Sequence, residues 1–271
     1  MMSSRYEKYH RDYIKTSIQR RLISPRNFTY VNFFRFVLPI IQRGKRRKIL
    51  DVGSGAGTLS LYLGGLGYTV VAVEPSKTAT IMAEKSAKKL KLENKVKFFH
   101  GRIEDFRYSY SFDLVLCLEV LEHCFDDSRV LSKIYDNLRS GGKLILSVPL
   151  KSAPLARLDL VSVFDEKVGH LRRYGKDEIF IKLKKAHFAV NNYIETEGII
   201  RNSLFIFPKL GFIVKFLNVY LSDCFTVIDD ILGKLFGCSD LIVVAVKKGD
   251  KADKTDRTDK TNEGDEGIKN I

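Results

Sequence analysis

Short apolar runs alternate with stretches of helical periodicity along most of the chain. The apolar runs are KILDV (48–52), TVVAV (69–73), VKFF (96–99), FDLVLCL (112–118) and KLILSV (143–148), and further strands are expected in 188–196 and 240–246. Helical patterns cover 57–65, 77–91 and 127–139, and Gly141 and Gly142 are expected to end the last of these helices. Near-continuous apolar strands that alternate with helices are typical of a mostly parallel sheet covered on both faces. The pattern therefore predicts an α/β fold over residues 48–248.

Three segments depart from this alternation. Residues 1–47 form a basic, aromatic-rich arm whose apolar residues recur at helical spacing, which predicts helices that pack on a neighbour. Residues 249–271 repeat Asp-Lys and Asp-Arg pairs with almost no apolar side chains, and we expect a disordered or solvated tail. The insert 199–239 is unusually apolar. We interpret it either as a lid of helices packed on the sheet or as an interfacial surface that meets a membrane or an apolar substrate.

Composition and charge narrow the class of protein. The chain has 271 residues, of which 45% are hydrophobic, so a core can be buried and global disorder is excluded. No apolar run of about eighteen residues lacks a charge, and the first residues contain no apolar signal segment, so we expect neither a membrane span nor secretion. Four cysteines without a CxxC pair fit the cytoplasm and give no metal-site pattern.

The net charge of +14 is unevenly distributed. Residues 1–48 hold thirteen Lys and Arg against two acidic residues, a net charge of +11, whereas the tail from 249 to 271 has five basic and seven acidic residues, a net charge of −2. A basic arm of this kind suits nucleic acid, an anionic membrane surface or an acidic substrate, and charge alone does not separate the three.

A glycine-rich loop follows the first predicted strand. Asp51 is the next-to-last residue of that strand, and Gly53, Gly55 and Gly57 then alternate before a helix begins. Glycines allow a sharp turn and close approach of a ligand to the backbone, and the N–H groups at a helix start favour electron-rich groups. Glu74 ends the second strand, 23 residues after Asp51, where a carboxylate would accept hydrogen bonds from ribose hydroxyls.

The spacing of the loop selects among nucleotide-binding families. A dinucleotide fingerprint has its third glycine five positions after the first, but here the interval is four, and the Lys-Ser/Thr pair of a P-loop is missing. DVGSGAGTLSLYL with VVAVEPS resembles the first two motifs of the class I S-adenosylmethionine-dependent methyltransferases. The resemblance covers residues 48–248 and implies a Rossmann-like, seven-stranded, mostly parallel sheet with helices on both faces and an antiparallel last strand.

The resemblance also assigns the residues that bind S-adenosyl-L-methionine. The methionine end would be lined by Asp51, Gly53, Ser54, Gly55 and Gly57. Glu74 would hold the ribose with Pro75 and Ser76 beside it, and Leu118 also belongs to the expected cofactor site. The segment 101–105, with Ile103 and Glu104, matches the stretch that contacts adenine in the family.

A candidate catalytic cluster follows the fourth predicted strand. If a helix starts there, Glu119 and His123 fall on one face at i and i+4, with Glu122 alongside. His123 would then serve as a base, or the cluster would bind a divalent metal ion such as Mg²⁺. The ExxEH arrangement resembles the ubiquinone-biosynthesis group of O-methyltransferases, in which the acidic pair and the histidine are associated with metal and acceptor. The plainer alternative is that Glu122 and His123 only cap and solvate a helix start.

A second candidate cluster, GHLRRY, resembles a segment on the acceptor side of small-molecule methyltransferases. In it, Arg172 or Arg173 would pair with a carboxylate or phosphate of the substrate, and His170 and Tyr174 would supply polar contacts. Surface charge before a helix is the alternative.

We therefore predict an enzyme that methylates a small-molecule acceptor, at an oxygen and on a lipid-linked or anionic metabolite. Residues 199–239 and the basic arm would supply peripheral membrane contact. An RNA or other nucleic-acid methyltransferase is disfavoured, because the position after the fourth strand lacks an Asn/Asp-Pro-Pro-aromatic run and Cys117 lies within a strand. A non-catalytic cofactor-binding subunit is the second alternative.

Overall fold

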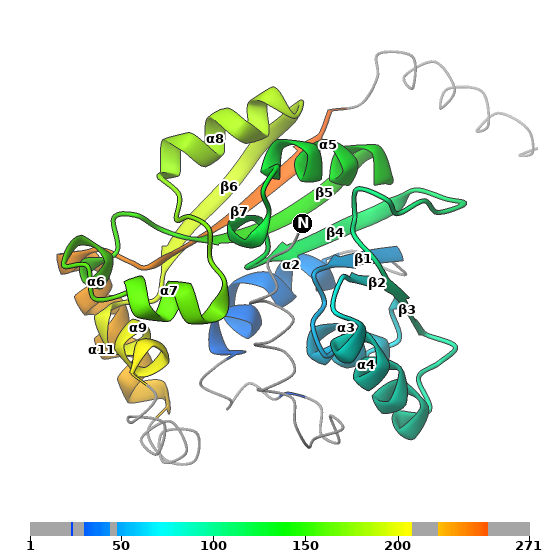
Figure 1. Ribbon diagram of the computed structural model, residues 1–271, viewed down its shortest axis with the longest axis horizontal. Coiled ribbons are helices and arrows are strands. Elements are labelled where there is room, and N and C mark those ends of the chain that lie inside the picture. The colour runs from blue at the N-terminus through cyan, green and yellow to red at the C-terminus, as the bar shows by residue number, and fades with distance from the viewer. Residues whose placement is uncertain (1–22, 24–29, 44–47, 208–221, 249–271) are drawn as a thin grey trace, which may run out of the picture.

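A computed structural model describes residues 23, 30–43, 48–207 and 222–248. Its centre is a seven-stranded sheet with the order β3-β2-β1-β4-β5-β7-β6 (Figure 1). The strands are β1 (Lys48–Val52), β2 (Thr69–Glu74), β3 (Val96–His100), β4 (Phe112–Leu118), β5 (Leu138–Pro149), β6 (Phe188–Thr196) and β7 (Asp240–Lys247). β7 runs antiparallel to both of its neighbours, β5 and β6, and the pairs from β3 to β5 are parallel. The predicted sheet and its antiparallel last strand are confirmed.

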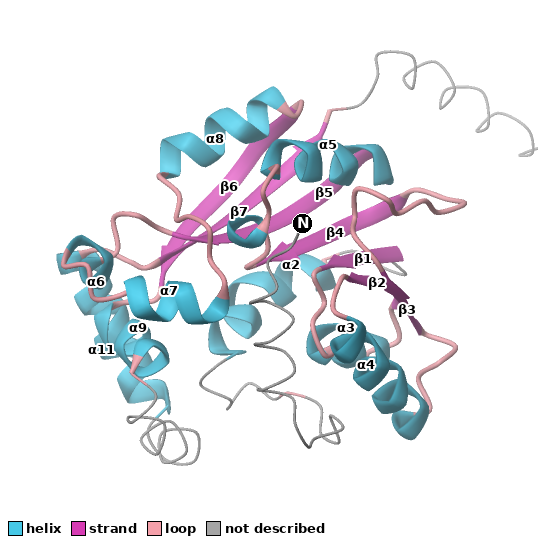
Figure 2. Cartoon of the chain, in the orientation of Figure 1, coloured by secondary structure: helices cyan, strands magenta, loops and turns pink. Residues whose placement is uncertain are grey.

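Helices cover the sheet on both faces (Figure 2). They are α2 (Leu38–Gln42), α3 (Thr58–Gly65), α4 (Lys77–Leu90), α5 (Asp127–Asn137), α6 (Pro154–Arg157), α7 (Ser162–Val168), α8 (Lys176–Lys185), α9 (Ile199–Ile206) and α11 (Ser222–Phe236), with a π-helical turn, η2 (Phe33–Val37), and a 3-10 turn, η3 (Leu121–His123). Helices α5 and α8 pack on one face of the sheet, whereas η2, α2 and α3 pack on the other. Among the described residues, no helix has the length and apolarity needed to cross a bilayer.

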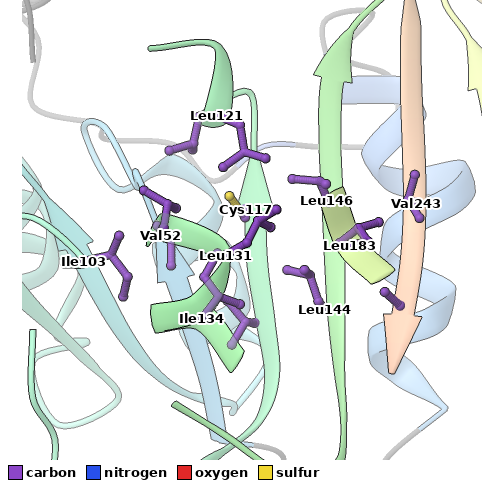
Figure 3. Packing of buried hydrophobic residues seen from close by; sticks show 14 of the residues in the cluster. Val52, Ile103, Cys117, Leu121, Leu131, Ile134, Leu144, Leu146, Leu183 and Val243 are labelled. Atoms are coloured by element: carbon purple, nitrogen blue, oxygen red, sulfur yellow. The ribbon is translucent and has the colours of Figure 1, made fainter. Parts of the chain in front are cut away.

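The core between the sheet and α5 and α8 holds the strand ends in place. Leu131 and Leu183 of these helices contact the same apolar cluster as Cys117, Leu146 and other strand residues (Figure 3). These side chains are fully buried, and each buried leucine stabilises the fold by roughly 2 kcal/mol. The loops that leave the carboxyl ends of β1, β2 and β4 therefore start from rigid positions.

The described part of the N-terminal arm is helical. Phe33, Val37 and Ile41 are buried against the face of the sheet opposite α5, and Phe33 meets the ring of Tyr62 edge-on at 6.1 Å. The other residues of the arm, the tail 249–271 and the middle of the apolar insert lie outside the described residues.

The junction between α5 and β5 differs from the sequence prediction. The helix ends at Asn137, and Gly141 and Gly142 lie within β5 rather than at the end of the helix. Leu138 is buried and pairs with Phe112, and the register then shifts before Lys143. Gly141 supplies the left-handed φ of 70° that this irregularity needs.

The insert contains two described helices that pack together. The carboxylate of Asp229 in α11 accepts hydrogen bonds from the backbone N–H groups of Gly198, Ile200 and Arg201, which satisfies the first turn of α9. Asp229 is 1% exposed, so α11 directs a polar residue inward. The described part of the insert thus contains two helices that contact each other, α9 and α11.

Candidate active site

The glycine loop needs glycine at each alternate position. Gly53, Gly55 and Gly57 have φ values of 70°, 55° and 78°, in the left-handed region that side chains disfavour. A Cβ on Gly53 would lie 2.5 Å from Val120 Cγ2, and one on Gly57 would lie 2.7 Å from Phe98 Cζ. The loop is therefore closed on one side by packing and cannot widen to accept a larger residue.

Glu74 organises the loop from the end of β2. Its Oε2 accepts a hydrogen bond from the Gly55 N–H at 2.8 Å, and its Oε1 accepts one from the Ser76 N–H at 2.8 Å. The side chain is 1% exposed, so the charge is held by directed donors rather than by water. This fixes the carboxylate at the edge where the predicted ribose contact would lie.

Asp51 and Ser54 give the loop polar groups that face away from bulk water. Ser60 Oγ donates to Asp51 Oδ2 at 2.5 Å. Burial raises the pKa of Asp51 to about 6, although the hydrogen bond from Ser60 opposes the rise. Ser54 Oγ is buried without a hydrogen-bonding partner among the described residues. Such a hydroxyl is an available donor or acceptor for a ligand.

A pocket of about 220 Å³ opens beside this loop, at the carboxyl ends of β1, β2 and β4. β1 and β4 are neighbours in the sheet although two strands separate them in sequence, and ligands of open α/β sheets bind at such a switch point. The pocket is lined by predicted site residues and by others: Val52, Gly53, Val73, Pro75, Gly101, Arg102, Ile103, Glu104, Val120, His123, Cys124, Phe125, Asp126 and Arg129.

Some lining residues carried no signal in the sequence. Phe125, Asp126 and Arg129 follow η3 in the chain and line the pocket without belonging to any motif. Gly101 and Arg102 belong to a segment that the family resemblance did mark. Leu118, which was expected in the cofactor site, is half-buried and does not line this pocket.

The segment after β4 does not begin an α-helix, so the expected common face of Glu119 and His123 is wrong. Glu119 has a left-handed φ of 55°, and only a 3-10 turn follows. The carboxylate of Glu119 turns toward β5, where Ser147 Oγ donates to its Oε1 at 2.6 Å. The Glu119 N–H also donates to the Ser147 carbonyl, so pairing between the strand ends overrides the local helical preference.

Glu122 and His123 are buried, which excludes the alternative in which they only solvate a helix start. Glu122 is fully buried, and neither of its carboxylate oxygens has a hydrogen-bonding partner among the described residues. Burial, reinforced by the charge of Glu119, raises the pKa of Glu122 well above its usual range. His123 Nδ1 lies 3.1 Å from the Gly169 carbonyl, and its ring is 4.9 Å from the ring of His170.

A metal ion would find a different donor set from the predicted one. One ligand atom each from Glu122, His123 and His170 lies within 4.8 Å of the others, and within the described ranges Glu119 is not part of this set. One carboxylate and two imidazoles fit Zn²⁺ or another transition metal better than Mg²⁺, which prefers oxygen ligands. The orphaned carboxylate of Glu122 is compatible with such an ion.

Asp165 organises the second predicted cluster. It accepts hydrogen bonds from Arg173 Nε and Nη2, both at 2.7 Å, and lies 2.9 Å from His170 Nδ1. His170 Nε2 then faces Glu122 Oε1 at 3.9 Å. Although burial alone would raise the pKa of Asp165, the hydrogen bonds from His170 and Arg173 hold it below its usual value. Asp165 begins this cluster in the sequence, but no motif marks it for this role.

The other two members of that cluster point elsewhere. Tyr174 is buried and donates to Leu121 O at 3.0 Å and to Asp127 Oδ2 at 2.8 Å. Arg172 lies 3.4 Å from the same carboxylate. Tyr174 therefore lies in the core, where a substrate cannot reach it. Arg172 and Arg173 already pair with carboxylates of the same chain.

Comparisons with known proteins find similarity to methyltransferases. The model of a methyltransferase-domain family matches residues 50–146. The mitochondrial ubiquinone biosynthesis O-methyltransferase of Schizosaccharomyces pombe is 34% identical over 139 residues, which cover 51% of this chain and 50% of that protein. The chain therefore spans about half the length of this curated relative.

Two solved structures show the same fold. A methyltransferase of Thermotoga maritima, described as a possible histamine N-methyltransferase, has a TM-score of 0.58 at 17% identity and covers 92% of this chain and 100% of its own. Magnesium protoporphyrin IX methyltransferase of Synechocystis, with bound S-adenosylhomocysteine, has a TM-score of 0.58 at 17% identity, with coverage of 88% and 93%. Residues 50–146 therefore match a methyltransferase domain, and the chain resembles the class I S-adenosylmethionine-dependent methyltransferases, in particular the ubiquinone-biosynthesis O-methyltransferases.

Proposed function

We propose that the protein transfers the methyl group of S-adenosylmethionine to a hydroxyl oxygen of a small-molecule acceptor. The observation that carries the proposal is the buried group of Glu122, His123 and His170, of which His123 lines the pocket beside the glycine loop. Methyl transfer is an in-line displacement that depends mainly on positioning, and a hydroxyl acceptor also needs a group that takes its proton. The O-methyltransferase name of the curated relative supports oxygen as the acceptor atom.

The cofactor would lie along the ends of β1, β2 and β4. Asp51 and the glycine loop would hold the methionine end, Glu74 the ribose with Pro75 and Ser76 beside it, and the segment 101–105 the adenine. Glu74 and Ser54 support this placement, because one fixes a buried charge and the other offers an unpaired hydroxyl at the loop. The sulfonium would then be directed toward His123 and the acceptor.

Cofactor affinity should fall below about pH 6. The pKa of Asp51 is raised to about 6, so the free protein takes up a proton there as the pH falls, whereas the ammonium group of the cofactor favours the ionised carboxylate. Binding then has to release that proton, and the affinity drops about tenfold for each pH unit below 6. Calorimetry between pH 5 and 8 checks this, and Asp51→Asn should bind more weakly with a flat profile. A wild-type affinity that does not change with pH would contradict the role of Asp51.

His170 would act on the acceptor side. Its Nδ1 is held by Asp165, which leaves Nε2 directed at the Glu122 carboxylate and the reaction centre. His170→Ala should lower turnover by about 10²- to 10⁴-fold, the usual contribution of a proton-transferring group, and leave cofactor affinity unchanged. The exposed His187→Ala is the matched control. Turnover of His170→Ala within a few-fold of the wild type would exclude this role, and chelator treatment of both proteins tests for a bound metal ion.

The described end of the apolar insert supports a lipid-linked acceptor or peripheral membrane contact. Val227, Ile231 and Leu235 of α11 are 58%, 51% and 70% exposed, whereas Asp229 faces the fold. An apolar outer face of this kind can enter a bilayer interface. The protein should bind phosphatidylcholine–phosphatidylglycerol vesicles at low salt, and Ile231→Glu with Leu235→Glu should release it. Ile181→Glu, at an exposed position on α8, should not. Equal release by both variants would remove the membrane proposal.

The paired arginines do not support an anionic acceptor. Arg173 donates two hydrogen bonds, from Nε and Nη2, to the carboxylate of Asp165, and Arg172 forms an ion pair with Asp127. RNA methylation and a non-catalytic cofactor-binding role stay as alternatives. Incubation with methyl-labelled S-adenosylmethionine and a cell extract separates them, by showing whether RNA, small molecules or no fraction takes up the label.

A further inference from the structure

Three acidic residues lie at the ends of β4, β7 and β6, along the edge of the sheet that carries the pocket. Glu119 directly follows β4, and Glu197 directly follows β6. Asp240 begins β7, and because β7 is antiparallel its start lies at the same edge, paired with Pro149 and Thr196. This acidic edge (Glu119, Glu197, Asp240) therefore lies at the same edge of the sheet as the pocket, although none of the three residues lines it.

The chain holds two of these glutamates in a costly backbone conformation. Glu119 and Glu197 have φ values of 55° and 62°, which cost a non-glycine residue about 1 kcal/mol or more. Neighbouring strands fix both turns, since Ser239 N–H donates to the Glu197 carbonyl at 2.8 Å, as Ser147 fixes Glu119.

The carboxylates of Asp240 and Glu197 at the acidic edge have few hydrogen-bonding or cationic partners. The side chain of Asp240 makes no hydrogen bond or ion pair with the residues that the structure describes, and Glu197 accepts one long bond, from Asn32 Nδ2 at 3.3 Å. Burial, together with the charges of Glu119 and Glu197, raises the pKa of Asp240 well above its usual range. Burial likewise raises the pKa of Glu197 to about 7, although the charge of Arg201 opposes the rise.

The independent sign of a ligand is Glu122. It is fully buried, its two oxygens lack hydrogen-bonding partners among the described residues, and its charge is among those that act on Asp240. The nearby guanidinium groups are already engaged, since Arg173 binds Asp165 and Arg201 lies 3.7 Å from Asp229. His170 Nε2 lies 3.9 Å from Glu122 Oε1, beyond hydrogen-bonding distance, so a bound cation would lower the cost of burying this carboxylate.

We propose that the acidic edge and Glu122 form a subsite for an ammonium group carried by the acceptor. The inference rests on the proposed methyl transfer to a hydroxyl and adds that the acceptor is cationic at a second position. The strands that carry Glu119 and Glu197 are three strand spacings apart, about 14 Å between backbones. Binding measured with a chelator, and again with added Mg²⁺, distinguishes an organic ammonium group from a metal ion.

Three catechols with a cationic, a neutral and an anionic substituent test the subsite. Dopamine is cationic, 4-methylcatechol neutral and 3,4-dihydroxybenzoate anionic, and their binding to the full chain is measured by calorimetry with saturating S-adenosylhomocysteine and a chelator present. The dopamine affinity should exceed that of the neutral compound about tenfold, the effect of 1.4 kcal/mol of charge interaction, and the anion should bind most weakly. Asp240→Asn with Glu197→Gln should remove the preference without changing S-adenosylhomocysteine affinity, and Glu195→Gln, whose carboxylate pairs with Lys176, should keep it.

The outcomes separate the subsite from the proposed function. Equal affinities for the three compounds, or tightest binding of the anion, would overturn the subsite even if all three are methylated. A cation preference that depends on Asp240 and Glu197, but without methyl transfer to any catechol, would uphold the subsite and count against the proposed function. A further titration omits the chelator and adds Mg²⁺. If Mg²⁺ abolishes the preference for dopamine, and Asp240→Asn with Glu197→Gln no longer binds Mg²⁺, the acidic edge binds a metal ion and the proposal is overturned.

Discussion

Replacing Glu74 by alanine is expected to weaken S-adenosylmethionine binding by about 100-fold. Two backbone N–H groups, from Gly55 and Ser76, donate to this buried carboxylate and would lose their partner. Each hydrogen bond to a charged group is worth about 1.5–3 kcal/mol, and the variant also loses the proposed ribose contact. A loss of about 3 kcal/mol corresponds to that factor in the dissociation constant.

Calorimetric titration with S-adenosylhomocysteine measures the effect directly. Glu84→Ala removes an exposed carboxylate from α4, two turns from the site, and should bind as the wild type does. Glu74→Gln keeps one acceptor and should fall between the two. A change below threefold in Glu74→Ala would mean that the cofactor does not lie against the end of β2.

Gly53→Ala is expected to lower the free energy of unfolding by about 3 kcal/mol and to abolish cofactor binding. The backbone at this position has a φ of 70°, which costs alanine about 1–2 kcal/mol. The new Cβ would also lie 2.5 Å from Val120 Cγ2, and overpacking of this kind costs about 1–3 kcal/mol. Val120 itself lines the pocket, so any relief of the contact deforms the site.

Gly67→Ala separates the effect of backbone strain from that of a steric contact with the new Cβ. Gly67 has a φ of 94°, but a Cβ there meets nothing within 4 Å. Thermal unfolding should therefore show a smaller loss of stability in Gly67→Ala, with cofactor affinity unchanged. Equal losses of stability and intact binding in both variants would show that the tight contact at Gly53 does not shape the pocket.

The fold was predictable because its signals are local and agree with one another. The runs 48–52 and 112–118 match β1 and β4, since strands buried on both faces are apolar throughout. The error at Gly141 arose because glycine marks both helix ends and strand irregularities. Only the pairing of Leu138 with Phe112 distinguishes these two uses.

The local geometry of the glycine loop was predictable from one motif, whereas the contacts of groups held by other strands were not. The glycine loop and Glu74 follow one another along the chain, and together they resemble the S-adenosylmethionine-binding motifs of the family. The position of Glu119 depends instead on Ser147, which belongs to another strand, and the orientation of His170 depends on Asp165. Asp240 and Glu197 carry no motif, because only the antiparallel β7 brings their strand ends together.

The most direct measurement of the central claim follows a labelled methyl group. The protein is incubated with methyl-labelled S-adenosylmethionine and a cell extract that is then separated into small-molecule, lipid and RNA fractions. We expect label in the small-molecule or lipid fraction, on an oxygen, and its loss in the Gly53→Ala and His170→Ala variants. Label in the RNA fraction, or cofactor binding without transfer to any fraction, would contradict methylation of a small-molecule hydroxyl.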